Sequence, residues 1–179
     1  MHPATGPVPD GPVDPALTPQ PDREMDRPTV YTLMAPGWWP PLGALTQCYG
    51  FCFTPEGRVV LVSPGERRWT LPGGTVEPGE QPYDTLVREV AEEACARVLR
   101  ARYLACQHVS DPEAPDGRTS HYQARWWARV ELDGWDPQFE IEERCAVPVE
   151  EMLATLCWGE KAIAGRLLSM ALAVEAEEG

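Results

Sequence analysis

The stretch that decides the fold is GTVEPGEQPYDTLVREVAEEACA, residues 74–96. Its apolar residues recur at the spacing of an amphipathic helix. They are Tyr83, Leu86, Val87, Val90 and Ala94. At about 100° per residue, these side chains share one face about 100° wide. The pattern predicts a helix that begins near Pro82, a residue suited to a first helical turn, and that ends near Cys95.

Carboxylates lie on another side of this helix. Glu89 and Glu93 fall about 40° apart, and Glu92 flanks Glu89 at about 60°. Adjacent carboxylates repel each other, so the arrangement costs least when a cation lies between them. Hard oxygen ligands select Mg²⁺ or Mn²⁺. The alternative is a solvated acidic face, which is the usual role of a charge run.

Two neighbouring features favour a site. Arg88 precedes Glu92 by four residues, where it can pair with that carboxylate and orient it. Upstream, residues 69–74 read WTLPGG, a strand end that runs into a glycine loop. Glycine permits positive φ angles and the close approach of a ligand to the backbone.

The spacing of these residues resembles the Nudix box. Gly74 is followed by five residues and Glu80, and then by seven residues and the run REVAEE at residues 88–93. The stretch departs from the box at Cys95, where the box has glycine, and at Ala96, where it has a larger aliphatic residue. Because the left-handed conformation is costly for a residue with a Cβ, the first departure puts the helix C-cap geometry in question.

The resemblance implies the Nudix α/β/α sandwich, an α/β fold with a mixed β-sheet between helices, in one domain over residues 29–179. The residue pattern agrees, because strand-like runs are interspersed with helical ones. The strand-like runs are 29–34, 45–53, 58–63, 69–71, 98–109 and 121–132, and two later helices are expected at 150–156 and 161–175. Residues 1–28 are rich in Pro, Asp and Gly, and we expect them to form a disordered or loosely packed arm.

The resemblance also implies metal-dependent hydrolysis. Glu89, Glu92 and Glu93 are expected to hold Mg²⁺ or Mn²⁺, together with the backbone carbonyl of Gly74. Glu80 and Arg88 are expected to form an ion pair that orients these ligands. The implied substrate is a small phosphorylated nucleotide.

The general base stays open at this stage. It is either a carboxylate of the box or one from a later loop. The leading loop candidates are Glu140 and Glu143, and the others are Glu142, Asp111, Glu113 and Asp116. His108 is a further candidate, although a structural histidine is the better interpretation of it.

Several aromatic side chains could stack on a base. They are Trp126, Trp127, Tyr122, Trp38 and Tyr31. Core packing is the better interpretation of each one. Since successive strand residues point to opposite faces, Trp126 and Trp127 are expected on opposite sides of the sheet.

Composition limits the partners and the compartment. A formal net charge of −13 disfavours polymeric nucleic acid, which is bound through Lys and Arg patches. No apolar run is long enough to span a membrane, and no signal-peptide pattern is present. The six cysteines are scattered, so we expect reduced thiols in a cytoplasmic protein. A homodimer is among the expectations.

Two functions follow as hypotheses. The first is a hydrolase that cleaves the pyrophosphate linkage of a nucleoside diphosphate joined to another moiety, as in a nucleotide sugar, a nucleoside triphosphate or a dinucleoside polyphosphate. The second is a catalytically silent Nudix-fold module that binds a nucleotide or regulates another process. The complete set of box carboxylates favours the first.

Overall fold

The central feature of the fold is one mixed sheet. The computed structural model describes residues 7–22, 28–137 and 140–178, with Leu42 described by its backbone alone. Within them, the sheet order is β1-β2-β6-β7-β3-β4-β8, and β5 pairs with β3 off this path. The strands are β1 (Gln20–Pro21), β2 (Val30–Leu33), β3 (Leu45–Phe53), β4 (Val59–Ser63), β5 (Gly73–Thr75), β6 (Ala96–Ser110), β7 (Ser120–Leu132) and β8 (Glu143–Val147).

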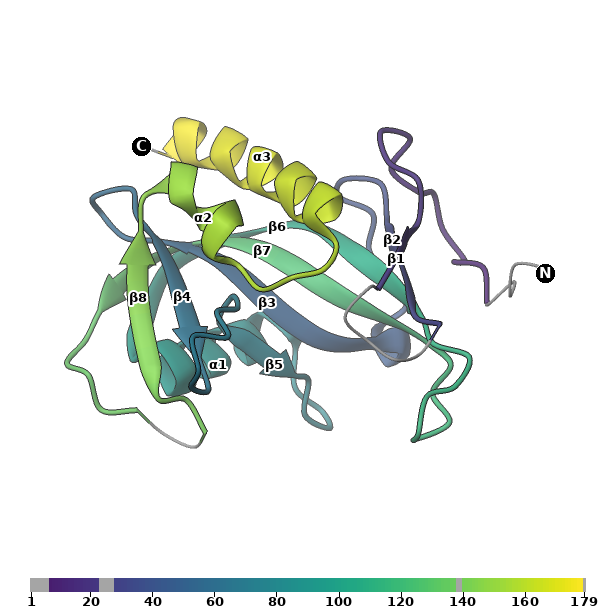
Figure 1. Ribbon diagram of the computed structural model, residues 1–179, viewed down its shortest axis with the longest axis horizontal. Coiled ribbons are helices and arrows are strands. Elements are labelled where there is room, and N and C mark those ends of the chain that lie inside the picture. The colour runs from purple at the N-terminus through teal and green to yellow at the C-terminus, as the bar shows by residue number, and fades with distance from the viewer. Residues whose placement is uncertain (1–6, 23–27, 138–139, 179) are drawn as a thin grey trace.

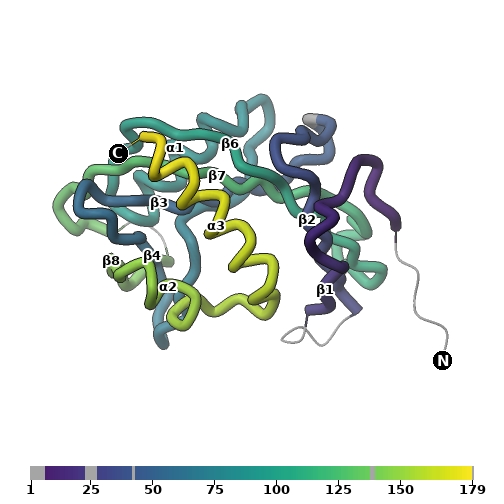
Figure 2. Tube along the Cα trace, turned by 90° about the horizontal axis from the view of Figure 1, so that it is seen from above, coloured from purple at the N-terminus to yellow at the C-terminus, as the bar shows by residue number. Residues whose placement is uncertain are grey.

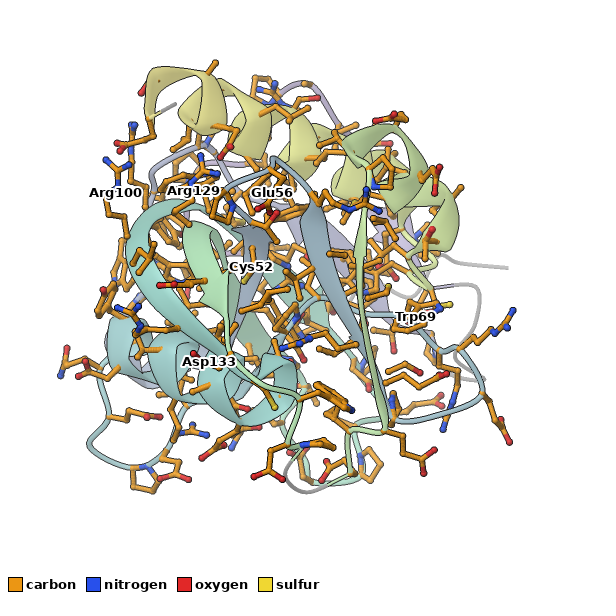
Figure 3. The ribbon with its side chains drawn as sticks, turned by 90° about the vertical axis from the view of Figure 1, so that its left-hand side faces the viewer. Cys52, Glu56, Trp69, Arg100, Arg129 and Asp133 are labelled. Carbon is orange, nitrogen blue, oxygen red and sulfur yellow. The ribbon has the colours of Figure 1, made fainter. Side chains whose placement is uncertain are left out.

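Helices cover both faces of this sheet (Figure 1). They are the short η1 (Leu42–Ala44), then α1 (Pro82–Ala94), α2 (Val149–Thr155) and α3 (Lys161–Glu178). The layers separate clearly in Figure 3, with α2 and α3 on one side of the sheet and α1 on the other. Buried side chains accordingly form two clusters, one around Trp127 toward α3 and one around Leu86 and Val90 of α1. The predicted α/β/α sandwich is confirmed.

Strand β7 shows how alternation divides the core. Trp127 belongs to the cluster under α3, whereas Trp126 belongs to the cluster on the α1 side. The two tryptophans lie on opposite faces, as the period of two in a strand requires. Arg129 follows Trp127 by two residues on the same face and lies near α3 in Figure 3, where its Nη2 donates to Glu175 at 2.6 Å.

The glycine loop that precedes α1 is attached to β3. Strand β3 runs parallel to β7, with Cys48 opposite Ala124, and antiparallel to β5, with Cys48 opposite Gly74 and Tyr49 opposite Gly73. The strand predicted at residues 69–71 is absent, and Thr70 makes only an isolated bridge to Val62. Pairing with β3 thus holds the loop in front of α1.

The C-terminus of α1 keeps a left-handed cap although glycine is missing there. Cys95 adopts φ 44° and ψ 55°. Arg144 of β8 donates from Nη1 to the carbonyls of Ala94 and Cys95 at 2.7 and 2.9 Å. The cap therefore survives the Cys95 substitution, because a guanidinium satisfies carbonyls that the helix leaves unpaired.

The described part of the N-terminal arm packs on the domain. Gln20–Pro21 form β1 beside β2, and Val13 bridges to Met34. Asp14 is 1 % exposed and accepts from Nε of Arg166 in α3 at 2.9 Å. Figure 2 shows this segment running alongside β2. Composition predicted a disordered or loosely packed arm; in this structure, backbone pairing and the ion pair of Asp14 with Arg166 attach residues 7–22 to the domain.

Candidate active site

Arg88 lies at the centre of the box carboxylates. Its Nε and Nη2 donate to the two oxygens of Glu80 at 2.9 and 3.0 Å, a bidentate pair. Its Nη1 donates to Glu89 at 2.9 Å and to Glu92 at 3.2 Å. Nη2 also donates to the Thr75 carbonyl at 3.0 Å, so Arg88 joins α1 to β5. The predicted Glu80–Arg88 pair is present.

Two carboxylates of α1 face the glycine loop. The Gly73 N–H donates to Oε2 of Glu93 at 2.9 Å. The Glu89 carboxylate lies so close to Gly74 that an added Cβ would meet its atoms at 2.5–2.7 Å. A side chain at position 74 would therefore displace the Glu89 carboxylate from its present position.

The surroundings shift the affinity of these groups for protons. Burial raises the pKa of Glu93 to about 7, and the negative charges of Glu89, Glu140 and Glu92 act in the same direction. Burial also raises the pKa of Glu89, against the opposing effect of Arg88. Hydrogen bonding to Arg88 instead lowers the pKa of Glu80 to about 2. Glu80 therefore stays charged, while Glu93 exchanges protons near neutral pH.

The structure separates the candidates of the later loops. Glu140 is exposed and close enough to Glu93 to affect its pKa. Glu143 lies in β8 opposite Ser63, and Glu142 lies against Gly65, so both belong to the β4–β8 edge. Asp111 and Asp116 accept backbone N–H groups of their own loop, from Glu113 at 3.2 Å and Arg118 at 2.9 Å.

His108 has a structural environment. It is 1 % exposed, its Nε2 lies 2.8 Å from Oγ of Ser120, and its ring packs on Tyr122. Burial lowers the pKa of this imidazole. The structural interpretation of His108 is therefore the better one.

Of the aromatic candidates, Trp126, Trp127 and Tyr122 are buried, whereas Trp38 and Tyr31 are half-buried, and Tyr31 lines the cavity beside Arg125. Trp127 is fully buried and donates from Nε1 to Glu175 at 2.8 Å. Tyr122 is 2 % exposed and packs on Trp38. Neither ring has a face open to solvent in this structure, and core packing accounts for both. Trp126 is 7 % exposed and packs against Tyr103, Trp39 and Tyr83.

Comparison with known proteins identifies the family. A family model described as "NUDIX domain" matches residues 48–167, more than half of the chain. This chain belongs to the Nudix family. The matched range contains the whole box; it begins within β3 and ends within α3.

Solved structures show the same Nudix fold. The pyrophosphohydrolase BsRppH of Bacillus subtilis is 21 % identical with a TM-score of 0.67, covering 91 % of this chain and 98 % of that one. The Ap4A hydrolase of C. elegans is 18 % identical with a TM-score of 0.53, covering 73 % and 98 %. The NUDIX domain of Shewanella oneidensis NrtR, complexed with ADP ribose, is 17 % identical with a TM-score of 0.54, covering 76 % and 89 %.

The residues of the Nudix box suit a hard divalent cation by their chemistry. The set consists of carboxylate oxygens around a glycine whose missing side chain leaves room for Glu89. In the described part of the chain, no three Asp, Glu, His or Cys side chains are already grouped as a metal site. Glu89 and Glu92 bind Arg88 and Glu93 binds the Gly73 N–H, so the three would have to turn toward an arriving ion.

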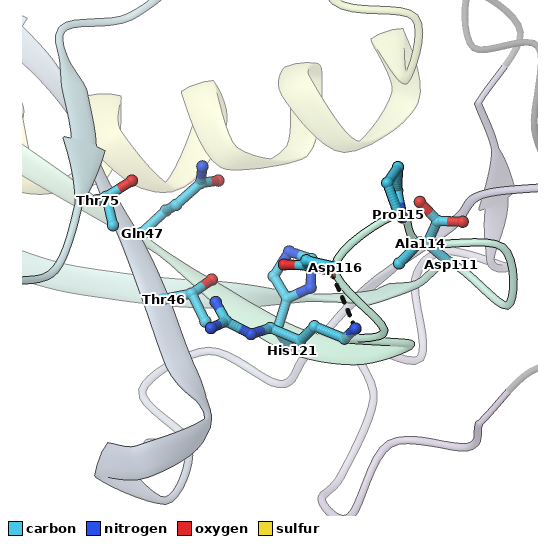
Figure 4. Close-up of a pocket in the computed structure, with 9 residues that line it drawn as sticks. Thr46, Gln47, Thr75, Asp111, Ala114, Pro115, Asp116 and His121 are labelled. Atoms are coloured by element: carbon cyan, nitrogen blue, oxygen red, sulfur yellow. Dashed lines mark hydrogen bonds between the residues drawn. The ribbon is translucent and has the colours of Figure 1, made fainter.

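One cavity lies at the Thr75 end of β5. It measures about 450 Å³ and is bounded by the 111–118 loop, the start of β3 and the end of β5 (Figure 4). Its polar lining residues are Thr46, Gln47, Thr75, Asp111, Asp116, Arg118 and His121. Thr75 connects it to the carboxylates, because the Thr75 carbonyl binds Arg88.

A smaller cavity of about 210 Å³ lies beside Arg125. Gln47 of the first cavity is opposite Gln123 of the second in the β3–β7 pair, so the two cavities adjoin. Sequence reasoning missed Arg125, although a signal existed. Arg125 shares the face of β7 that carries the core residue Trp127. A charged residue is rarely buried at such a core-facing position unless it has a partner.

Two further observations concern the helices and the cysteines. No helix among the described residues is long and apolar enough to cross a membrane. All six cysteines lie in the described part of the chain and are free.

Proposed function

We propose that this protein is a Mg²⁺- or Mn²⁺-dependent hydrolase that cleaves the pyrophosphate linkage of a nucleoside diphosphate joined to another moiety. The observation that carries the proposal is the pair Glu89 and Glu93, which both face the Gly73–Gly74 loop. Membership of the Nudix family supports it. So do the names of structural neighbours, which include a pyrophosphohydrolase and an Ap4A hydrolase.

In this proposal, Glu89, Glu92 and Glu93 would hold the cation together with the Gly74 carbonyl. Bound there, the cation supplies charge neutralisation for the phosphates and lowers the pKa of a water. Arg88 and Glu80 position the carboxylates, since their bidentate pair fixes the guanidinium from which Glu89 and Glu92 are held. Neither Arg88 nor Glu80 needs to touch substrate.

Two carboxylates are candidates for taking the proton of the attacking water. Glu93 is the buried one, and its raised pKa suits proton exchange near pH 7. Glu140 is the exposed one on the later loop, where it can approach a substrate bound at Glu93. Glu143 is the weaker of the two predicted loop candidates, because its place in β8 is opposite Ser63.

The two adjoining cavities support a nucleotide-type substrate. Thr75 of β5 lines the first cavity, and Tyr49, which is opposite Gly73 of β5, lines the second. A diphosphate lying along β5 would place its two substituents in opposite cavities. Small polar and aromatic linings of this kind suit nucleosides and sugars.

The test is a panel of nucleotide sugars, nucleoside triphosphates and dinucleoside polyphosphates with Mg²⁺ or Mn²⁺, assayed by phosphate release through coupling enzymes. Wild type should turn over one class, EDTA should abolish turnover, and Glu93→Gln should reduce it by at least about 100-fold. Glu150→Gln, a change at an exposed residue of α2, is the matched control and should keep full activity. Full activity in Glu93→Gln would overturn the proposal.

Binding of a nucleotide without turnover would instead support the silent module. A thermal shift by a nucleotide that no preparation hydrolyses is the result to look for. The cytoplasmic location, argued from the scattered spacing of the cysteines, and the homodimer stay predictions. Gel filtration with light scattering measures the second directly.

A further inference from the structure

Arg125 is a buried cation with an unusual set of partners. It lies in the middle of β7 and is 3 % exposed. Its guanidinium carbon lies 4.8 Å from the ring centroid of Tyr49 and 4.9 Å from that of Trp158. Stacking on rings uses the faces of a guanidinium and leaves its edge N–H groups as donors.

Those edge donors are only partly used. Nη1 donates to the Ala124 carbonyl at 3.2 Å and Nη2 to the Gln123 amide oxygen at 2.8 Å, both neutral acceptors. Nε has no hydrogen-bond partner among the described residues. A guanidinium taken out of water is costly unless hydrogen bonds compensate for the lost solvation, so this arrangement favours a ligand that brings acceptors.

The cavity beside Arg125 adjoins the proposed reaction centre. Tyr49 lines it and is opposite Gly73, whose N–H binds Glu93. Trp158 closes another side and donates from Nε1 to Thr70 at 3.3 Å. At about 210 Å³ it is smaller than the roughly 300–1,000 Å³ of drug-sized sites, which suits one part of a nucleotide.

The charges around the cavity indicate which part of a nucleotide it holds. Asp22 and Glu160 also line it, and their negative charge disfavours a phosphate group beside Arg125. A neutral planar ring with acceptors on one edge and donors on another suits both kinds of charge. Guanine is such a ring, with acceptors at O6 and N7 and donors at N1 and N2. Adenine would bring its N6 donor toward a group that only donates.

We propose, on the basis of the function proposed above, that this cavity holds a 6-oxopurine base and that Arg125 determines specificity by donating to O6 and N7. The phosphates then extend past Tyr49 toward Gly73 and the carboxylates of α1. Arg125 is a specificity-determining residue in this arrangement, since it contacts a part of the substrate that does not react.

The first test compares kcat/KM for guanine and adenine forms of the same substrate. Wild type should prefer guanine by about 5- to 150-fold, the discrimination expected of one bidentate contact. Arg125→Lys keeps the charge but loses the planar fork, and Arg125→Gln loses both, so each should bring the ratio close to one. Arg129→Lys is the matched control, because Arg129 lies on the same strand but is bound to Glu175, and it should keep the preference.

The ratio is measured within one preparation, so a partly unfolded variant does not change it. Equal turnover of guanine and adenine substrates by wild type would overturn the specificity and leave the hydrolase proposal standing. So would an unchanged preference in Arg125→Gln. Absence of any turnover would count against the hydrolase proposal alone. The base specificity would then be decided by the binding measurement below.

The second test measures binding without catalysis. In EDTA, GMP and IMP should quench tryptophan fluorescence more strongly than AMP, because Trp158 lines the cavity and IMP retains O6 and N7. Arg125→Gln should lose the difference between IMP and AMP, whereas Arg129→Lys should keep it. Equal affinity of wild type for all three nucleotides would overturn the proposal whatever the enzyme hydrolyses.

Discussion

The backbone N–H of Gly73 donates a hydrogen bond to Oε2 of Glu93 at 2.9 Å, so the glycine loop and the buried carboxylate of α1 are directly joined. Burial nevertheless dominates and raises the pKa of Glu93 to about 7. A carboxyl whose pKa is higher in the folded chain stabilises the fold fully below its unfolded value, about 4.3, and that contribution is lost as the pH rises through 7.

In EDTA, the free energy of unfolding of wild type relative to Glu93→Gln should therefore fall between pH 5 and pH 8. The expected change is on the order of 1–3 kcal/mol. Urea unfolding at several pH values measures it. The comparison with Glu93→Gln is needed because burial lowers the pKa of His108 and His121, which changes stability in the opposite sense. A difference that stays constant across this range would contradict the assignment.

Gly74→Ala should damage the site and leave the fold intact. The added Cβ would meet the Glu89 carboxylate at 2.5–2.7 Å and displace it. Activity and metal affinity should fall by about 10- to 100-fold, as when a supporting contact of a metal ligand is lost. Calorimetric titration with Mn²⁺ and steady-state kinetics measure the two effects.

Gly134→Ala is the control for that substitution, because nothing lies within 4 Å of its added Cβ. It should bind metal like wild type. Normal manganese affinity in Gly74→Ala would show that Glu89 does not need its present position.

Cys95 should tolerate glycine better than a branched residue. Its φ of 44° is left-handed, where a Cβ costs about 1–2 kcal/mol and a β-branched side chain costs more. Cys95→Gly should leave the free energy of unfolding unchanged or higher by up to about 1 kcal/mol, and Cys95→Val should lower it by about 1–3 kcal/mol. Thermal and urea unfolding give the order, and a Val variant as stable as the Gly variant would argue against the left-handed cap.

Arg166→Ala should release the arm and destabilise the domain. Asp14 is almost completely buried and depends on Nε of Arg166 at 2.9 Å. Removal of one partner of a buried pair leaves an unpaired charge, and because Arg166 itself is partly exposed we expect a loss of about 1–3 kcal/mol. Arg97→Ala, which breaks an exposed pair with Glu131, should cost less than about 0.5 kcal/mol.

Limited proteolysis adds a second measurement for the arm. Cleavage within residues 7–22 should be faster in Arg166→Ala than in wild type or Arg97→Ala. Restoration of wild-type stability by adding Asp14→Asn to Arg166→Ala would confirm that the loss comes from the unpaired charge. Equal stability of Arg166→Ala and wild type would contradict a stabilising role for this ion pair.

Local rules predicted what depends on local geometry. Helical spacing gave α1 its bounds within one residue, and the angle between Glu89 and Glu93 follows from the turn of a helix. Strand β3 was predicted at its observed bounds because its apolar run ends at a turn. The opposite orientations of Trp126 and Trp127 required only the period of two in a strand.

Features that depend on distant segments were not predicted. Arg166 of α3 holds the arm through Asp14. The composition of the arm cannot predict a partner so distant in the sequence. Glu140 and Glu143 are three residues apart in sequence, yet only the loop path decides which one approaches Glu93. The cavity at Arg125 needs Trp158 from the segment before α3, which the pattern of β7 cannot supply.

The parallel pairing of β3 with β7 has a consequence for how the chain folds. It places Cys48 beside Ala124, and the glycine loop, α1 and β6 all lie between them in sequence. Closing so large a loop costs chain entropy before its contacts form, which slows folding. Strand β5 pairs with β3, and β3 takes its central place in the sheet only once this long loop has closed. A nascent chain released before β7 is complete would therefore carry every residue of the box and still lack an ordered centre.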